Sequence, residues 1–87
     1  MLGYPNRGGR VTTTLEELAN GRKAKIVRVA GGRGLIYRLY QMGLTPGTEV
    51  EVLSNYGRGP IVIRVMGTEV AIGRGVARKI LVEPLPE

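Results

Sequence analysis

Hydrophobic residues recur along the chain first with the spacing of a helix and later with the spacing of strands. Leu35, Leu39 and Met42 occupy positions i, i+4 and i+7, which lie on one face of an α-helix. After residue 48 the period changes to two, and Val50 and Val52 alternate with glutamates, as in a strand with one buried face. The pattern therefore predicts an amphipathic helix at about residues 35–42 with a buried stripe, followed by a series of short strands.

A second, shorter helix is predicted near the amino terminus, at about residues 14–20. Thr14 and Glu17 have the spacing of a capping box, in which the threonine side chain accepts from the Glu17 amide and the glutamate reaches back. Leu15 and Leu18 would share the buried face of about two turns. The sequence thus places a short helix before the first long strand.

Glycine and proline mark the ends of these elements. Gly43 is expected to end the longer helix in a left-handed conformation, with Leu44 packing back on Leu39 as in a Schellman motif. The next segment, residues 45–48, has proline and glycine at the two central positions of a type II turn. Apolar alternation and β-branched residues then predict strands at residues 23–29, 49–53, 61–65, 70–72 and 80–82.

Together these elements predict a mainly β domain with short helices. The alternation slips between Ile26 and Val29, which indicates either a β-bulge in the first strand or burial of both of its faces. About five short strands favour a small closed sheet, because closure leaves no exposed strand edges. We expect a small SH3-like barrel with the longer helix inserted after the first strand. It would form one domain at residues 12–83, between a flexible N-terminal arm at residues 1–11 and a short tail at residues 84–87.

Composition narrows the chemistry that this domain can perform. The 87 residues include no cysteine, histidine or aspartate, so all seven acidic residues are glutamate. Disulfides, thiolate or imidazole metal sites and the Ser-His and Cys-His nucleophile systems are therefore excluded. We expect a non-enzymatic protein with no cofactor and no metal-binding residues. Paired carboxylates such as Glu49 and Glu51 can in principle hold a divalent cation, but we interpret them as solvated strand residues.

The charge balance favours an acidic partner. Thirteen basic and seven acidic residues give a net charge of +6, which attracts nucleic acid, an anionic membrane surface or an acidic protein face. Four tyrosines are the only aromatic residues, too few for a base-stacking platform, so we expect nucleic-acid binding to be weak and salt-sensitive. The first residues lack the apolar core of a secretory signal, and apolar runs are short. We therefore expect a cytoplasmic protein without membrane insertion.

Motifs along most of the chain resemble those of the FeoA family, in the same order from about Thr13 to Glu83. Two motifs carry the resemblance most specifically: Leu39-x-x-Met42-Gly43-Leu44-x-Pro46-Gly47 and Ala71-Ile72-Gly73-Arg74. The resemblance implies a small SH3-like accessory protein of ferrous iron uptake. It also implies a partner, the FeoB-type ferrous iron permease, which the protein would bind at its cytosolic GTP-binding domain or at a membrane-proximal surface.

Candidate partner-contact residues lie on the longer helix and in a later loop. Tyr37, Arg38 and Tyr40 fall beside the buried stripe of the helix, and Tyr56 and Arg58 fall in a glycine-rich loop. Tyrosine and arginine are enriched among the residues that dominate binding energy in protein interfaces. We expect these five residues to contact the partner, with the helix as the main surface.

Two other functions fit the sequence. One is a basic nucleic-acid-binding small barrel. A continuous Lys/Arg face would favour this function, whereas scattered arginines would not. The other is an SH3-like regulatory module of the kind attached to metal-dependent repressors of the DtxR type, which docks a peptide or undergoes self-association. Here no winged-helix portion and no metal-ligand set accompanies the module. A free-standing accessory protein is therefore the preferred hypothesis.

Overall fold

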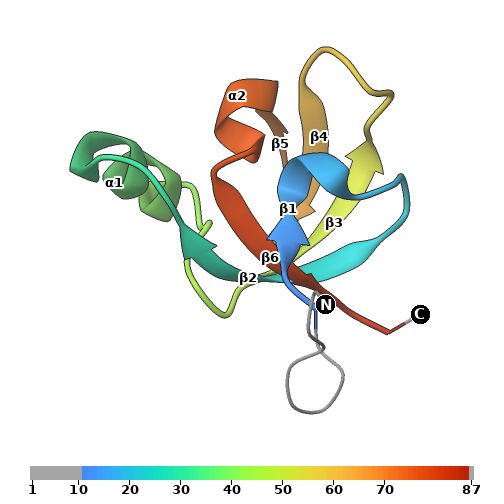
Figure 1. The fold of residues 1–87 in the computed structure, drawn as a ribbon, viewed down its shortest axis with the longest axis horizontal. Coiled ribbons are helices and arrows are strands. Elements are labelled where there is room, and N and C mark those ends of the chain that lie inside the picture. The colour runs from blue at the N-terminus through green and yellow to red at the C-terminus, as the bar shows by residue number, and fades with distance from the viewer. Residues whose placement is uncertain (1–10, 87) are drawn as a thin grey trace.

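Six antiparallel strands form one curled sheet in the computed structural model, which describes residues 11–86 (Figure 1). The sheet order is β1-β6-β2-β3-β4-β5. The strands are β1 (Thr13–Thr14), β2 (Lys23–Val29), β3 (Glu49–Ser54), β4 (Ile61–Val65), β5 (Thr68–Ile72) and β6 (Ile80–Pro84). The helical elements are the 3₁₀ turn η1 (Leu15–Glu17), α1 (Arg33–Gln41) and α2 (Arg74–Ala77). Most of the N-terminal arm predicted at residues 1–11 lies outside the described residues.

The prediction of a mainly β fold with short helices is confirmed, with one strand more than the five expected. The additional strand, β1, is only two residues long and pairs with β6 through Thr13–Val82 and Thr14–Leu81. It escapes pattern analysis because two residues carry no periodicity. Within the described residues, no helix is long and apolar enough to cross a membrane.

The hydrophobic core fills the inside of the curled sheet. Val50 and Val52 of β3 are buried, as their alternation with glutamates predicted. The inserted helix α1 contributes Leu39 as its one buried residue, with Leu35 and Ile36 partly buried. The remaining core residues lie at alternate positions of the strands or in the short helical elements and turns: Leu15, Leu18, Ala24, Ile26, Val29, Leu44, Ile61, Ile63, Val65, Ile72, Ala77, Ile80 and Val82.

A bulge in β2 bends the sheet where α1 is inserted. The register of β2 against β6 shifts between Ile26 and Arg28, which confirms the predicted bulge and leaves Val27 exposed. Ile26 also ties β2 to the turn that follows α1: its N–H donates to the Thr48 carbonyl at 2.8 Å, and its carbonyl accepts from the Gly47 N–H at 2.7 Å. These two hydrogen bonds hold the turn after α1 beside β2, where the chain re-enters the sheet.

The N-terminal helix predicted at residues 14–20 is wrong in length. Its helical part is the single turn η1, and Thr14, which pairs in β1, makes no side-chain capping bond. In a 3₁₀ turn the residues at i and i+3 lie on the same side. Leu15 and Leu18 therefore both reach the core without a second turn, and the chain leaves Leu18 in an extended conformation.

The end of α1 follows the prediction for Gly43. Its φ is +92°, its N–H donates to the Tyr40 carbonyl at 3.0 Å, and the Leu44 N–H donates to the Leu39 carbonyl at 2.9 Å. These are the two hydrogen bonds of a Schellman motif. The turn brings Leu44 into the core beside Leu39. Met42 is therefore not part of a buried stripe, contrary to the prediction, and is 39% exposed.

A polar cluster joins three segments at the open side of the sheet, where β1 and β5 are not paired with each other. The Asn55 side-chain amide donates to the carbonyl oxygens of Glu16 at 3.0 Å and Leu18 at 2.7 Å, and its oxygen accepts from Arg74 at 2.9 Å. The Glu16 carboxylate faces Arg74 at 3.7 Å and Arg78 at 3.2 Å. The cluster thus links η1, the β3–β4 loop and α2 across this gap.

Candidate functional site

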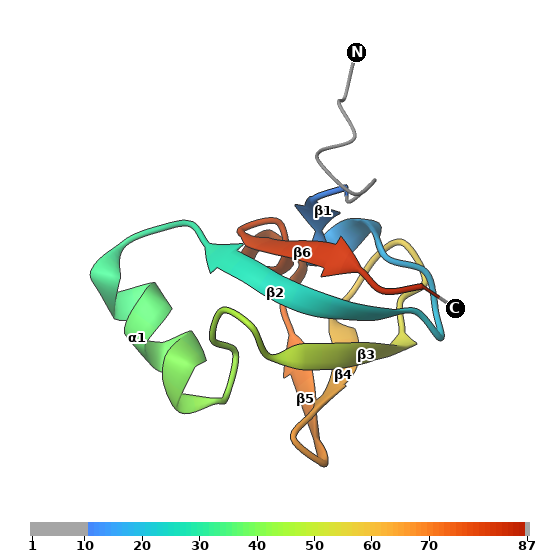
Figure 2. The same ribbon diagram turned by 90° about the horizontal axis from the view of Figure 1, so that it is seen from below.

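The exposed face of α1 carries three of the five predicted contact residues. Tyr37 is 65% exposed, Tyr40 is 41% exposed, and Arg38 lies between them, also exposed. Burial of Leu39 orients the helix, so the other side of α1 faces solvent at one end of the molecule (Figures 1 and 2). This exposure is what a partner contact requires, while the contact itself stays a prediction.

A shallow hollow lies between the C-terminal end of α1 and the β4–β5 hairpin. Tyr40 and Met42 form its helical side, and Val65, Met66 and Val70 form its hairpin side. Met42 and Met66 are 39% and 79% exposed, so two flexible thioether side chains line a surface open to solvent. Methionine adapts its shape to different apolar partners. We call this surface the apolar groove; its lining is completed by Gln41, Gly43 and Thr68.

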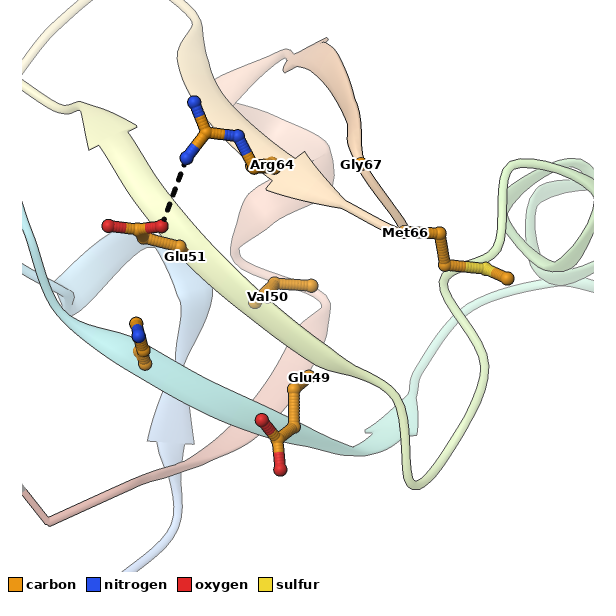
Figure 3. Close-up of a pocket in the computed structure, with 7 residues that line it drawn as sticks. Glu49, Val50, Glu51, Arg64, Met66 and Gly67 are labelled. Carbon is orange, nitrogen blue, oxygen red and sulfur yellow. Dashed lines mark hydrogen bonds and ion pairs between the residues drawn. The ribbon is translucent and has the colours of Figure 1, made fainter.

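The backbone of the hairpin holds Met66 over the helix end. Met66 and Gly67 both have positive φ, at +52° and +79°, as a two-residue type I′ hairpin turn requires. A Cβ at Gly43 would lie 3.0 Å from the Met66 sulfur, so the thioether sits directly against the turn after α1. Figure 3 shows the Met66 side chain directed toward that turn. The groove is therefore built by two tight turns that face each other.

A second hollow continues the apolar groove along β5 toward α2. Met42 lines both hollows, so they adjoin at this residue. Leu35 and Arg38 form the α1 side of the second hollow, and Ala71 and Val76 lie opposite. β5 is the last strand of the sheet order, so one of its edges is not paired with another strand of the described residues. Of the predicted residues, the structure brings Tyr40 and Arg38 to the two hollows and leaves Tyr37 on the outer face of the helix.

Tyr56 and Arg58 lie elsewhere. Both belong to the β3–β4 loop, where Tyr56 is 78% exposed and Arg58 is exposed. Both views place this loop well away from α1 (Figures 1 and 2). The five predicted residues thus form two separate surfaces. Sequence reasoning missed Met42 and Met66; a methionine directly before Gly67 in a hairpin turn was the available signal for an exposed apolar side chain.

The outer face of the sheet carries a ladder of alternating charges, part of which is shown in Figure 3. The Glu51 carboxylate accepts from the Arg64 guanidinium at 3.2 Å, and Lys23 lies directly opposite Glu51 on β2. Glu49 lies opposite Lys25 in the same way. Cross-strand cations therefore face the two carboxylates that were weighed as a cation site. Residues 11–86 contain no group of three or more carboxylate, imidazole or thiol side chains that could hold a metal ion.

Comparison with protein families finds a match to the FeoA domain over residues 13–84. A candidate Fe(2+) transport protein A of Methanocaldococcus jannaschii is 38% identical over 63 residues, which cover 72% of this chain and 76% of that protein. A crystal structure of an iron uptake regulatory protein, FeoA, superposes with a TM-score of 0.82 at 39% identity. That alignment covers 86% of this chain and all of the other.

Two further structures bear on the fold. The FeoA of Stenotrophomonas maltophilia, described as a prokaryotic SH3 domain protein and solved with zinc, has a TM-score of 0.71 at 25% identity, over 80% of this chain and 88% of that one. The predicted SH3-like architecture is thereby confirmed. A manganese-dependent transcriptional repressor has a TM-score of 0.77 at 19% identity, over 85% of this chain and 41% of the repressor. At that identity the likeness concerns the fold alone.

Proposed function

The chain belongs to the FeoA family, whose domain spans residues 13–84, and on this premise we propose that it is a non-enzymatic accessory protein of ferrous iron transport. It binds the cytosolic part of a FeoB-type permease, in the cytoplasm, and modulates the permease's assembly or activity. The observation that carries the proposal is the apolar groove, where exposed Met42 and Met66 lie beside Tyr40. Exposed apolar side chains gathered around a hollow suit a protein partner.

Binding, and not chemistry, is the mode of action that the residues support. The chain has no histidine, cysteine or aspartate for acid-base or nucleophilic work. A binding protein can act by shifting its partner toward the conformation that it binds better, and the shift is limited by its differential affinity for the two conformations. The accessory role requires nothing beyond such a contact.

The contact is proposed to centre on α1. Tyr40 and Arg38 border the two hollows, and Tyr37 adds an exposed aromatic ring on the same helix. Tyr56 and Arg58 are proposed as a second, separate contact, since a partner would have to reach around the sheet to touch both surfaces. Self-association through the same groove is the main competitor, because methionine-rich surfaces are adaptable.

The test is a binding titration of the full chain against the purified cytosolic GTP-binding domain of the permease. Tyr40→Ala should weaken binding by about 30-fold, the effect of losing about 2 kcal/mol at a hot spot. Tyr56→Ala is the matched control, since it removes the same side chain from the other surface. Equal effects of the two substitutions, with both variants folded, would contradict the assignment of α1 as the main contact. Analytical ultracentrifugation of the chain alone measures self-association in parallel.

The nucleic-acid alternative is separated by a salt series. Binding to the permease domain should persist at about 0.15 M salt, where exposed charges more than ~8 Å apart are largely screened. Binding to duplex DNA or single-stranded RNA should fade over the same range and show no sequence preference. Salt-resistant, sequence-selective binding to nucleic acid, with none to the permease domain, would replace the accessory role by a nucleic-acid-binding role.

A further inference from the structure

The net positive charge of the chain arises from one continuous segment. Residues 18–48 contain six basic residues and no acidic residue, which equals the net charge of +6 of the whole chain. The remainder of the chain carries seven basic and seven acidic residues and is neutral in sum. This segment comprises β2, α1 and the turns that flank them. The charge is therefore concentrated on one part of the fold and is not spread evenly.

Elsewhere in the fold, most carboxylates face cations. Glu16 pairs with Arg74 and Arg78, and Arg64 bridges Glu51 and Glu69 at 3.2 and 3.8 Å. Within the acid-free segment, the two lysines at the start of β2 are compensated as well, because the β-sheet register sets them directly opposite glutamates of β3 and β6: Lys23–Glu51, Lys25–Glu49 and Lys25–Glu83. The uncompensated charge of the segment thus lies at the end of β2 and on α1.

Three cations that pair with no carboxylate of the described residues surround the loop between β2 and α1. Arg28 precedes the loop, Arg33 follows it, and Lys79 is held beside it, since the Ala30 N–H donates to the Lys79 carbonyl at 2.7 Å. All three basic side chains are exposed. No carboxylate of residues 11–86 lies within ion-pair distance of them. We call Arg28, Arg33 and Lys79 the basic end; Arg38 extends the positive charge along α1.

We propose that the basic end docks on the anionic headgroups of a lipid bilayer surface. Arg28, Arg33 and Lys79 line neither the apolar groove nor the hollow that adjoins it, and the three exposed cations come from three different parts of the chain. Such a surface suits a planar array of headgroups better than a single bound anion. The loop between β2 and α1, beside which these residues lie, is at one end of the molecule (Figure 2). Each basic residue near an anionic surface contributes about a five-fold factor in partitioning, or about 1 kcal/mol.

Docking at this end would orient the apolar groove. α1 leads from the basic end to the groove, and nine helical residues span roughly 13 Å. With the basic end on the headgroups, the groove opens at the level of the membrane-proximal part of a membrane protein. This orientation rests on the proposed partner, whereas the docking on lipid does not.

The experiment is co-sedimentation of the full chain with vesicles that contain no protein. Vesicles of about 40 mol% phosphatidylglycerol in phosphatidylcholine are compared with pure phosphatidylcholine, at about 0.05 M and 0.5 M salt. The test variant is Arg33→Gln with Lys79→Gln, which keeps the groove and all proposed permease contacts. The matched control is Lys23→Gln with Arg58→Gln. Each double substitution lowers the net charge from +6 to +4.

The unmodified chain should bind the anionic vesicles at low salt and leave them at high salt. The test variant should lose about 25-fold in partitioning, from two factors of about five, while the control should stay within about three-fold of the unmodified chain. Equal losses in both variants would show that only net charge matters and would overturn the proposal. Absence of binding to anionic vesicles at low salt would also overturn it. So would a result in which the substitutions at Arg33 and Lys79 weaken binding to duplex DNA but not binding to anionic vesicles. Binding of the test variant to the permease domain in solution should be unchanged, so failure here is separate from failure of the proposed function.

Discussion

The glycine that ends α1 offers a direct test of how the apolar groove is built. Gly43 has a φ of +92°, and its turn carries the two hydrogen bonds that bring Leu44 into the core. A substituted side chain meets two obstacles there. The left-handed backbone is strained for any L-residue, and the new Cβ would lie 3.0 Å from the Met66 sulfur.

The two obstacles differ in size. A non-glycine residue held at positive φ costs about 1–3 kcal/mol, with β-branched residues at the upper end. The contact with Met66 costs less, because the sulfur lies near the far end of an exposed, flexible side chain that can move aside. Gly43→Ala should therefore lower the free energy of unfolding by about 1–2 kcal/mol, and Gly43→Val by more. In a domain of this size, about 1 kcal/mol shifts the melting temperature by roughly 4–8 °C.

Urea denaturation measures these differences, provided that the slope of the transition is the same in each variant. Gly34→Ala is the matched control: it lies in α1, where the new Cβ would meet no atom within 4 Å apart from its chain neighbours and the helix backbone. It should be neutral or stabilising by about 0.5–1 kcal/mol. Gly43→Ala combined with Met66→Ala removes the steric contact and leaves the backbone strain. A Gly43→Val protein with the same melting temperature as the unmodified chain would refute the left-handed end of the helix.

Three further predictions concern the core, the polar cluster and metal. Leu39→Ala, at a side chain only 3% exposed, should cost about 2–5 kcal/mol in urea denaturation, and a loss below 1 kcal/mol would place Leu39 outside the core. Asn55→Ala should cost about 1–3 kcal/mol by the same measurement, because the Glu16 and Leu18 carbonyls and the Arg74 guanidinium lose a partner; unchanged stability would mean that water replaces the amide. Anaerobic calorimetric titration with ferrous iron should detect no stoichiometric site of micromolar or better affinity, since the chain lacks histidine, cysteine and aspartate.

Local signals in the sequence were sufficient for the five longer strands and for the turns. Period-two alternation located β3 and β4, because one buried face imposes that period on any strand of five or six residues. Gly43 and Gly47 were identifiable because only glycine adopts positive φ without strain, and both have a φ of +92°. The slip of alternation in β2 likewise reported a real bulge. In each case the cause acts within a few residues.

The errors arise where partners distant in sequence decide the structure. Thr14 pairs with Leu81 of β6 as part of β1, and the helical turn that follows it is a single 3₁₀ turn without a side-chain capping bond. Asn55 gathers Glu16 and Arg74 from segments far apart along the chain. Neither contact leaves a mark in the local pattern of residues. The same holds for the groove, because the approach of Met66 to Gly43 depends on how the hairpin packs against the end of α1.

The way α1 is attached explains why this small barrel can carry a binding surface without losing stability. Leu39 is the one residue of α1 that is buried, and the Gly43 turn then delivers Leu44 to the core. The exposed residues of the helix, among them Tyr37 and Arg38, contribute little to that attachment. Substitutions there should change binding and leave stability nearly intact, since surface replacements usually stay within about 0.5 kcal/mol. The inserted helix is therefore the part of the domain where substitutions can create new partner contacts with the smallest loss of stability.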